Sequence, residues 1–407
     1  MKKFIALSLV LALAVGAVFA ELKIGGQAGI GVTAVSGTSE DDSVLGAGIS
    51  DTATGGRIEA VYSNDPGSFG ALVRVKPLEG LVTGTDRVFA WWQPLPQVKL
   101  TLGKDGNGQF ALNYLVAATY HHFQAEDYVA YGGYGMTRFA WSYVGFTDLG
   151  AALTLTPLKG LAINVGVPYD KSEEAEEVYK HTTGQVTYDI ADVGQIGVTF
   201  VGGAGYSWDT TNSRPVTDPS AVYAQFYLTA IKPLQLNVGL KYSFPGDFDM
   251  PAGPAGSLEV KAAYPIAAGF GLNYNISNTI GVKARLAAAF AGSQERSNGV
   301  TVDEPLRLGF DLMPYFDLGF LRLFLNTGIG YTAETANPGT GNKIDDSQVF
   351  SWYINPYITK SVGPSIFYVG FQLYSDGSKV DVSNPMIPVD KDPIIGWAIP
   401  LGIQVFF

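Results

Sequence analysis

Short runs in which apolar and polar residues alternate recur along the chain. The run at 234–243 has Leu234, Leu236, Val238, Leu240 and Tyr242 at one parity, with Gln235, Asn237, Gly239, Lys241 and Ser243 at the other. Similar runs occur at 257–264, 279–290 and 305–314. Side chains alternate across a β-strand, so each run predicts a strand with one apolar and one polar face. No apolar stretch reaches the ~20 residues that a membrane-spanning helix needs.

Turn signals divide these strands into hairpins. Short Pro- or Gly-containing turns are predicted at 64–67, 94–97, 157–160, 192–195, 232–235, 277–280, 316–319 and 361–364. Longer polar segments alternate with them. The spacing predicts an all-β, antiparallel up-and-down barrel of about 18 strands, with about 16 as the alternative.

The C-terminal residues 394–407 also alternate and end on an aromatic residue. Gly402, Val405 and Phe407 match the glycine, hydrophobic and aromatic positions of an assembly signal, whereas Leu401 departs from its polar first position. This segment resembles the closing strand of bacterial outer-membrane β-barrels of the porin type. The resemblance implies a transmembrane barrel that is inserted by the barrel assembly machinery. It also implies short periplasmic turns and long external loops.

The N-terminal residues 1–20 predict export. Lys2 and Lys3 precede an apolar run that ends in small residues, which indicates a secretory signal peptide cleaved after Ala20. The predicted first strand follows at once, so residues 21–407 are expected to form a single transmembrane β-barrel domain without a plug. Localisation in the outer membrane of a diderm bacterium, with outer-membrane lipid around the barrel, follows from these two ends.

Composition excludes several classes of protein. The net charge is −11, and it becomes −13 once the two signal-peptide lysines are removed, which argues against nucleic acid as a partner. The chain has no cysteine, so it has neither disulfides nor thiolate metal sites. Its three histidines, His121, His122 and His181, fit no catalytic or metal-binding motif. We therefore predict no enzymatic activity, no cofactor and no metal.

Strand parity predicts a basic inner wall inside this acidic protein. Charged residues on the lipid-facing side of a barrel cost ~2 to 4 kcal/mol near the midplane, so they are expected to face inward. The predicted pore-lining residues are Arg57, Arg74, Lys76, Arg87, Lys99, Lys241, Lys261, Lys283, Arg285, Arg307, Asp311 and Arg322. A charged lining selects ions by sign, so a modest anion preference is expected.

The longest connection, 104–135, is predicted between the fifth and sixth strands. Porins place an inward-folding constriction loop there, and Asp105, Tyr120, Glu126 and Asp127 are its candidate pore-facing residues. An external loop that covers the barrel mouth is the alternative. The resemblance to porins also allows a homotrimer.

These patterns predict a water-filled channel for passive diffusion of small hydrophilic solutes. A barrel of this size without a plug is expected to hold an aqueous channel. Inward-parity aromatic residues also leave open a sugar track or interface girdles; they are Phe89, Trp91, Tyr353, Tyr357, Tyr368 and Tyr374. A fatty-acid-transporter-like barrel for hydrophobic substrates and a surface adhesin barrel are the alternative functions.

Overall fold

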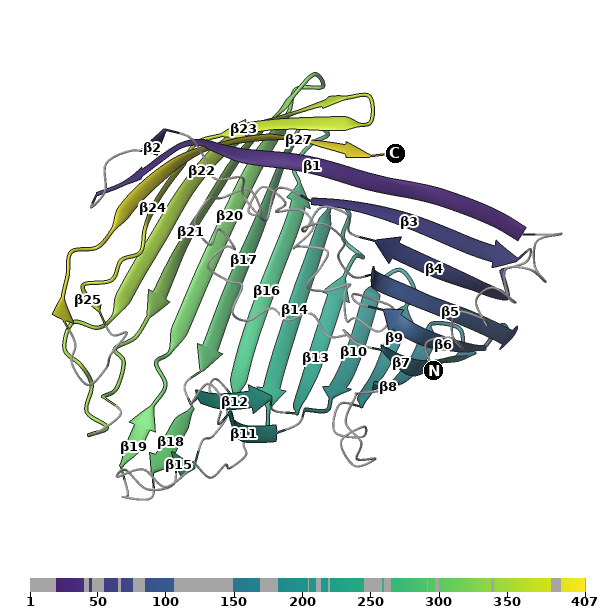
Figure 1. Cartoon of the computed structure of the whole chain (residues 1–407), viewed down its shortest axis with the longest axis horizontal. Coiled ribbons are helices and arrows are strands. Elements are labelled where there is room, and N and C mark those ends of the chain that lie inside the picture. Colours follow the sequence, from purple (N-terminus) through teal and green to yellow (C-terminus); the bar gives the residue numbers. More distant parts are fainter. Residues whose placement is uncertain are drawn as a thin grey trace.

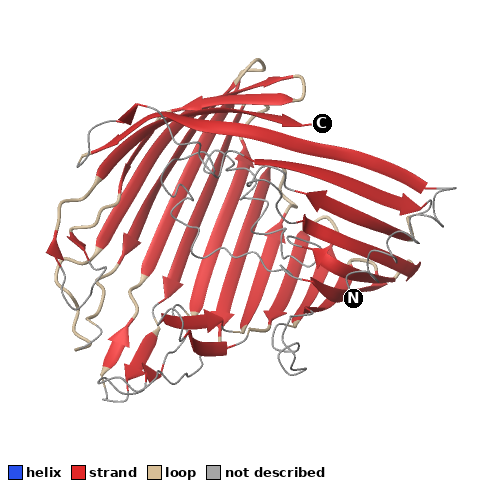
Figure 2. Ribbon diagram, viewed as in Figure 1, coloured by secondary structure: helices blue, strands red, loops and turns tan. Residues whose placement is uncertain are grey.

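All regular elements in the described part of the chain are β-strands (Figure 2). The computed structural model describes residues 20–39, 44–45, 55–64, 67–75, 85–105, 149–168, 182–203, 205–209, 214–218, 220–244, 258–259, 265–290, 292–296, 300–337, 340–381 and 389–406. The all-β class predicted from the alternation is therefore confirmed.

One antiparallel sheet closes on itself to form a barrel (Figure 1). The wall strands are arranged around the sheet in chain order, and β27 pairs with β1 to complete the circuit. The wall strands are β1 (Ala20–Thr38), β3 (Gly55–Asn64), β4 (Phe69–Val75), β5 (Thr85–Leu95), β6 (Val98–Asp105), β7 (Leu149–Leu158), β8 (Leu161–Pro168), β9 (Thr183–Ile190), β10 (Gly194–Val201), β13 (Ala221–Leu228), β14 (Leu234–Ser243), β16 (Ile266–Asn275), β17 (Ile280–Phe290), β20 (Arg307–Asp317), β21 (Arg322–Thr332), β22 (Val349–Val362), β23 (Ser365–Gly370), β24 (Gln372–Ser375) and β27 (Ile395–Phe406).

The sheet contains 20 strands in the described residues. One of them, β2 (Val44–Leu45), pairs only with the end of β1, and β24 continues the line of β23 between the same neighbours. The closed circuit of described strands therefore has 18 positions. The predicted up-and-down barrel is confirmed.

The first and last strands meet at the seam of the barrel. β1 pairs with β3 over Ala20–Gly29 and with β27 over Gln27–Thr38, so only residues 27–29 have both neighbours. Gly402 lies opposite Gly31 and Val405 lies opposite Ala28. Phe407, the terminal residue of the predicted assembly signal, lies outside the described residues.

Tight turns join the wall strands at one end of the barrel, and all of the predicted short turns fall there between consecutive wall strands. The turn between β20 and β21 shows how they form. Gly319 adopts a φ of 81°, which favours glycine, and its N–H donates to Asp317 Oδ1 at 2.9 Å. Leu318 N also donates to Leu321 O at 2.9 Å. The local sequence therefore sets this turn.

The opposite end carries longer connections with small accessory strands. These are β11 (Gly205–Asp209), β12 (Arg214–Asp218), β15 (Leu258–Glu259), β18 (Ser293–Arg296), β19 (Thr301–Asp303), β25 (Val380–Asp381) and β26 (Val389–Asp390). The predicted wall strand at 257–264 is wrong, because Leu258 and Glu259 pair with β18 in a separate sheet. The wall position beside β14 belongs to β16, whose alternation supplies a longer outward apolar face.

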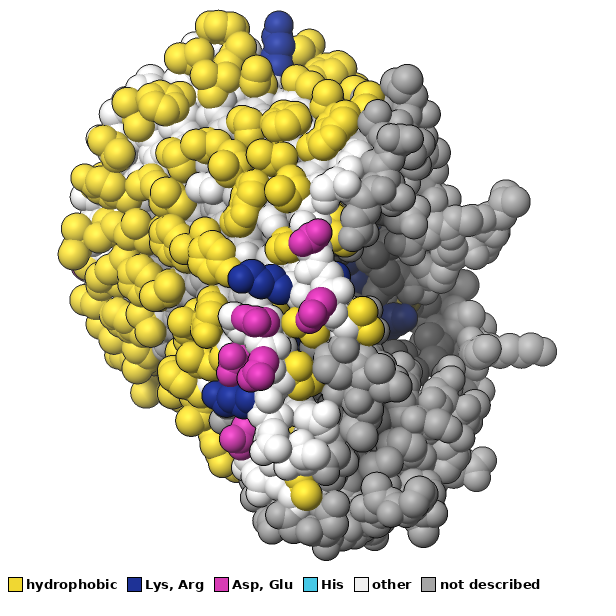
Figure 3. All heavy atoms as spheres, turned by 90° about the vertical axis from the view of Figure 1, so that its left-hand side faces the viewer, with side chains coloured by type: hydrophobic (Ala, Val, Ile, Leu, Met, Phe, Trp, Pro, Cys, Tyr) yellow, Lys and Arg dark blue, Asp and Glu magenta, His cyan; other side chains and the backbone are white. Residues whose placement is uncertain are grey.

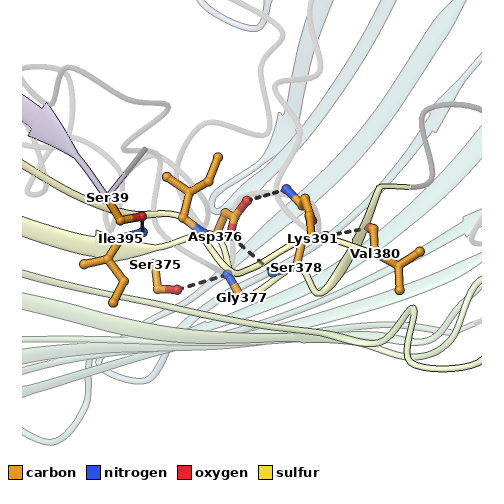
Figure 4. A network of polar contacts seen from close by, with 9 residues as sticks. Ser39, Ser375, Asp376, Gly377, Ser378, Val380, Lys391 and Ile395 are labelled. Atoms are coloured by element: carbon orange, nitrogen blue, oxygen red, sulfur yellow. Dashed lines mark hydrogen bonds and ion pairs between the residues drawn. The ribbon is translucent and has the colours of Figure 1, made fainter. Parts of the chain in front are cut away.

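A polar network braces the connection between β24 and β27 (Figure 4). Asp376 Oδ1 accepts from the N–H groups of Ser378 and Ile394, at 3.2 and 2.9 Å. Asp376 Oδ2 lies 2.9 Å from Lys391 Nζ. Ser39, just after β1, accepts from Ile395 N through its hydroxyl at 3.1 Å. One carboxylate thus holds both ends of this connection near the seam.

The outer face of the barrel is broadly apolar. Figure 3 shows one side covered by hydrophobic side chains, with acidic and basic side chains gathered along one border. Large apolar residues such as Leu240, Leu286 and Ile329 remain about half exposed, at 50%, 52% and 47%. The strand neighbours of Leu286 and Ile329 on the opposite parity are buried. The apolar faces of the strands therefore point away from the barrel interior.

Candidate pore wall

Polar side chains occupy the inner face of the barrel. Along β17, Lys283 and Arg285 are buried while Leu286 and Phe290 are exposed. β20 alternates in the same way. Asp311 is buried, whereas Leu308 and Phe310 are exposed and Leu312 is half-buried. A buried charge in an apolar environment is costly unless it is paired. The contacts of these side chains therefore decide what the wall can do.

An ion pair lies at the centre of one inner wall. Arg285 Nη2 is 3.5 Å from Asp311 Oδ2, and the two side chains are 2% and 0% exposed. The Tyr353 hydroxyl lies 2.9 Å from Asp311 Oδ1 and 3.0 Å from Asn326 Oδ1. Because that hydroxyl has a single proton, it donates to one of these oxygens at a time. We call these four residues the charged network.

Glycines make room for the network. Arg285, Asp311, Gly328 and Tyr353 are in register across β17, β20, β21 and β22. A Cβ atom on Gly328 would lie 2.5 Å from both Asp311 Oδ1 and Tyr353 Cε1. Only a residue without a side chain lets the Tyr353 ring lie across β21 and reach Asp311.

The same pairing of glycine with an aromatic ring recurs around the barrel. A Cβ atom on Gly70, Gly281 or Gly396 would lie within 2.3 Å of the ring of Trp91, Tyr315 or Tyr374. Each glycine is in register with its aromatic partner. On β27, the Tyr374 ring occupies the space beside Gly396.

An aromatic row lies nearer the tight turns. Tyr315, Phe324 and Tyr357 are in register across β20, β21 and β22. Phe324 stacks on Tyr357 at a centroid distance of 4.6 Å and an interplanar angle of 5°, and Tyr315 lies 5.9 Å from Phe324. Tyr357 also donates its hydroxyl proton to Met313 Sδ at 3.3 Å. The row forms a continuous apolar strip on an otherwise polar wall.

Two lysines contact aromatic rings in matching geometry. Lys283 Nζ lies 5.6 Å from the ring centroid of Tyr315, and Lys241 Nζ lies 5.6 Å from that of Tyr223. Among the described residues, neither lysine has a carboxylate within 4.0 Å. These two positions hold positive charge that described carboxylates do not offset.

The other predicted cations on this side of the barrel have acidic neighbours. Arg322 donates through Nε to Asp317 Oδ2 at 2.6 Å and keeps 60% of its side chain exposed. Arg307 lies at the far end of β20, close to Glu304. Burial raises the pKa of the Glu304 carboxyl, and the charge of Arg307 opposes part of that rise.

A second group of inner-wall side chains, on β8–β10, forms a network of uncharged groups. Asn164 donates through Nδ2 to Gln185 Oε1 at 2.9 Å, and Gln185 donates through Nε2 to Thr199 Oγ1 at 3.2 Å. All three side chains are buried. We call this chain of hydrogen bonds the neutral network. None of its members was predicted from the sequence. An uncharged polar residue at inward parity can line a pore or can only pack against other side chains, and the sequence does not distinguish these roles.

The wall on β3–β6 combines cations with large rings. Arg74 Nη1 lies 3.9 Å from Glu59 Oε2. The Arg87 guanidinium carbon is 5.2 Å from the Phe89 ring centroid, and Lys99 Nζ is 5.4 Å from that of Trp91. Arg87 and Lys99 therefore share one face of this wall with Phe89 and Trp91.

The constriction-loop prediction is only partly covered by the structure. Asp105 does not belong to that loop, because it is the last residue of β6 and pairs with Arg87 of β5. The strand pairing extends two residues into the predicted connection, through Lys104 and Asp105. The connection does join the fifth and sixth wall strands, as predicted. The remaining predicted residues Lys76, Tyr120, Glu126, Asp127 and Lys261 lie outside the described residues, and of Arg57 only the backbone is described.

No grouping of three or more potential metal ligands occurs in the part of the chain that the structure describes. None of the described residues belongs to a helix long and apolar enough to cross a membrane.

No protein-family model and no curated protein matches this chain. Among solved structures, it is similar to an anion-selective porin from Comamonas acidovorans, with 12% identity, a TM-score of 0.47, and coverage of 95% of this chain and 100% of that one. It is also similar to the outer-membrane channel DcaP of Acinetobacter baumannii, with 11% identity, a TM-score of 0.47, and coverage of 96% and 98%. A third similar structure is OmpF of Salmonella typhi in complex with daunomycin, with 12% identity, a TM-score of 0.46, and coverage of 95% of this chain and 97% of that one. Because these TM-scores are all below 0.5, the barrel and its inner wall carry the argument for function.

Proposed function

We propose that this chain is an outer-membrane porin, a water-filled channel for passive diffusion of small hydrophilic solutes. The supporting observation is the closed circuit of strands with apolar side chains outside and ionised or amide side chains inside. A closed barrel satisfies every ladder hydrogen bond within the wall, which a bilayer requires of a spanning sheet. In water the outward apolar face would lack a covering layer, whereas lipid supplies one.

The ends of the chain extend this proposal. We assign residues 1–20 to a signal peptide cleaved after Ala20 and residues 21–407 to a single barrel domain in the outer membrane. The tight turns then face the periplasm, and the connections that carry β11–β12, β15, β18–β19 and β25–β26 face outward. Gly402, Val405 and Phe407 form the signal for the barrel assembly machinery, and the folded barrel assembles as a homotrimer.

The wall contacts sharpen the expected ion selectivity. Arg285, Arg74 and Arg322 each have an acidic partner, so their charges are locally offset. Lys241 and Lys283 contact tyrosine rings instead. The proposed anion preference is therefore modest and depends chiefly on these two lysines in the described part of the wall.

Single-channel recording in planar bilayers tests the proposal. The purified, folded protein is expected to insert with discrete conductance steps and to give an anion-selective reversal potential in a salt gradient. Replacing both Lys241 and Lys283 by Met is expected to lower the anion preference. The matched control, Arg285→Met with Asp311→Leu, removes one charge of each sign and is expected to leave it unchanged.

Two outcomes would contradict separate parts of the proposal. Absence of conductance steps from protein whose folding is verified would reject the channel. Cation selectivity with normal steps would reject only the anion preference. Liposome swelling with neutral and charged solutes of equal size then tests whether passage depends on size alone.

A further inference from the structure

A patch of the inner wall near the tight turns combines positive charge with flat aromatic surface. We call it the turn-side patch, and it consists of Lys283 on β17, Tyr315 on β20, Arg322 and Phe324 on β21, and Tyr357 on β22. Lys283 contacts the Tyr315 ring, and the three rings form the continuous row described above. Hence one end of an aromatic strip carries a cation.

The environment of Lys283 leaves its charge uncompensated. Its side chain is 8% exposed, and among the described residues its ammonium contacts a tyrosine ring and no carboxylate. Arg285, two residues along the same strand, has Asp311 as a partner. The attraction of a ring face for an ammonium group is smaller than the cost of removing that charge from water. An anion beside Lys283 would supply the missing compensation.

Neighbouring groups fix the positions of the rings in the aromatic row. The Tyr315 ring lies over Gly281, and its hydroxyl donates to Asn275 Oδ1, which fixes the orientation of the ring. Tyr315 and Phe324 are partly exposed, whereas Tyr357 is buried at 7% and supports Phe324 from the next strand. Arg322 uses Nε for Asp317 and keeps its exposed guanidinium near the mouth of the barrel.

We propose that the turn-side patch binds aromatic carboxylates, with the carboxylate at Lys283 and the ring against Tyr315 and Phe324. This inference rests on the proposed function, because it places the site inside a solute channel. An inorganic anion would use the lysine but leave the aromatic row without a contact. A neutral sugar would stack on the rings but leave the ammonium charge uncompensated. An aromatic carboxylate satisfies both features.

Isothermal titration of the full-length protein, folded in detergent micelles, tests the site without requiring conduction. Benzoate is the probe, and acetate and benzyl alcohol are probes that lack the ring or the charge. Benzoate is expected to bind at least about tenfold more tightly than either, because each lacks one class of contact worth about 1.4 kcal/mol or more.

Lys241 provides a matched control, since it has the same lysine–tyrosine distance but is outside the aromatic row. Lys283→Met is expected to weaken benzoate binding about tenfold, and Lys241→Met to change it less than about twofold. Lys283→Arg, which keeps the charge, is expected to retain binding within about threefold and to report on correct folding of this wall. Tyr315→Leu is expected to weaken binding about threefold or more.

The outcomes separate this inference from the channel proposal. No benzoate binding, equal binding of benzyl alcohol, or equal loss in the Lys241 and Lys283 variants would overturn the inference. In each of these cases, conductance steps in planar bilayers would leave the porin function standing. If the protein binds benzoate as expected but gives no conductance steps, the binding site is supported and the channel proposal is rejected.

Discussion

The charged network on β17–β22 and the neutral network on β8–β10 are built on the same antiparallel ladder. In the first, Arg285, Asp311, Tyr353 and Asn326 meet around an ion pair that is almost completely buried. In the second, Asn164, Gln185 and Thr199 share hydrogen bonds between uncharged groups. Both satisfy polar side chains inside a barrel.

The difference lies in what each network loses when one member is removed. Truncating an amide leaves one neutral donor or acceptor unpaired, whereas truncating Asp311 leaves a buried guanidinium charge. The charged network also needs Gly328 at its centre, where a Cβ atom would lie 2.5 Å from Asp311 Oδ1 and from the Tyr353 ring. The loss of one member is therefore expected to cost more in the charged network than in the neutral network.

The largest effect is expected from Asp311→Leu. It should lower the free energy of unfolding by about 3 to 5 kcal/mol, because Arg285 loses its buried partner. Urea unfolding in lipid vesicles measures this value. Adding Arg285→Met should recover a large part of the loss. Equal stabilities of Asp311→Leu and the unaltered protein would mean that the buried pair is not a constraint.

The second-largest effect is expected at Gly328. Gly328→Ala places a Cβ atom against Asp311 and Tyr353, and overpacking of this kind costs about 1 to 3 kcal/mol. Gly184→Ala is the control, because Gly184 has the outward parity of β9 and a Cβ atom there would meet no atom within 4 Å. It should change the free energy of unfolding by less than about 0.5 kcal/mol. Comparable losses in the two variants would mean that the contacts around Gly328 are not a constraint.

The neutral network should respond less. Gln185→Leu removes the acceptor for Asn164 and the donor to Thr199, which should cost about 1 to 2 kcal/mol in the same unfolding assay. A loss as large as that of Asp311→Leu would show that amide networks constrain this barrel as strongly as ion pairs.

The smallest effect is expected at the half-exposed pair in the external connection. Lys391→Met removes the contact with Asp376, whose two side chains are 28% and 25% exposed, and should cost about 0.5 kcal/mol or less. Limited proteolysis should nevertheless cut the connection faster, because the brace shown in Figure 4 is weakened. Unchanged cleavage would assign the bracing to the backbone hydrogen bonds of Asp376 alone.

The barrel itself could be predicted because its rules are local. Period-two alternation assigned Lys283 and Arg285 to the inner face, and glycine- and proline-containing turns such as 316–319 marked the hairpins. Both signals depend only on neighbouring residues. The strand predicted at 257–264 fails for the same reason, since alternation does not reveal which strand will pair with the wall.

The contacts of the inner wall could not be predicted because they depend on register. Asp311 faces Arg285 across β17 and β20, and a long connection at 291–306 joins these strands without fixing their alignment. The sequence therefore predicted a more uniformly positive wall than the structure has, because Arg285 and Arg322 are paired with aspartates. A glycine opposite an aromatic residue was the one signal that could have revealed Gly328 and Tyr353, once the register was known.

The split pairing of β1 has a consequence for the order of assembly. Every other wall contact joins strands that follow one another, whereas β1 and β27 are separated by nearly the whole chain. Closing so long a loop carries an entropic cost of about 5 kcal/mol by chain statistics, and that cost must be met before the seam contacts form. The seam should therefore be the slow, final step of folding. Until the seam forms, both edges of the growing sheet are unpaired. A partner that covers these edges would prevent them from pairing with other chains.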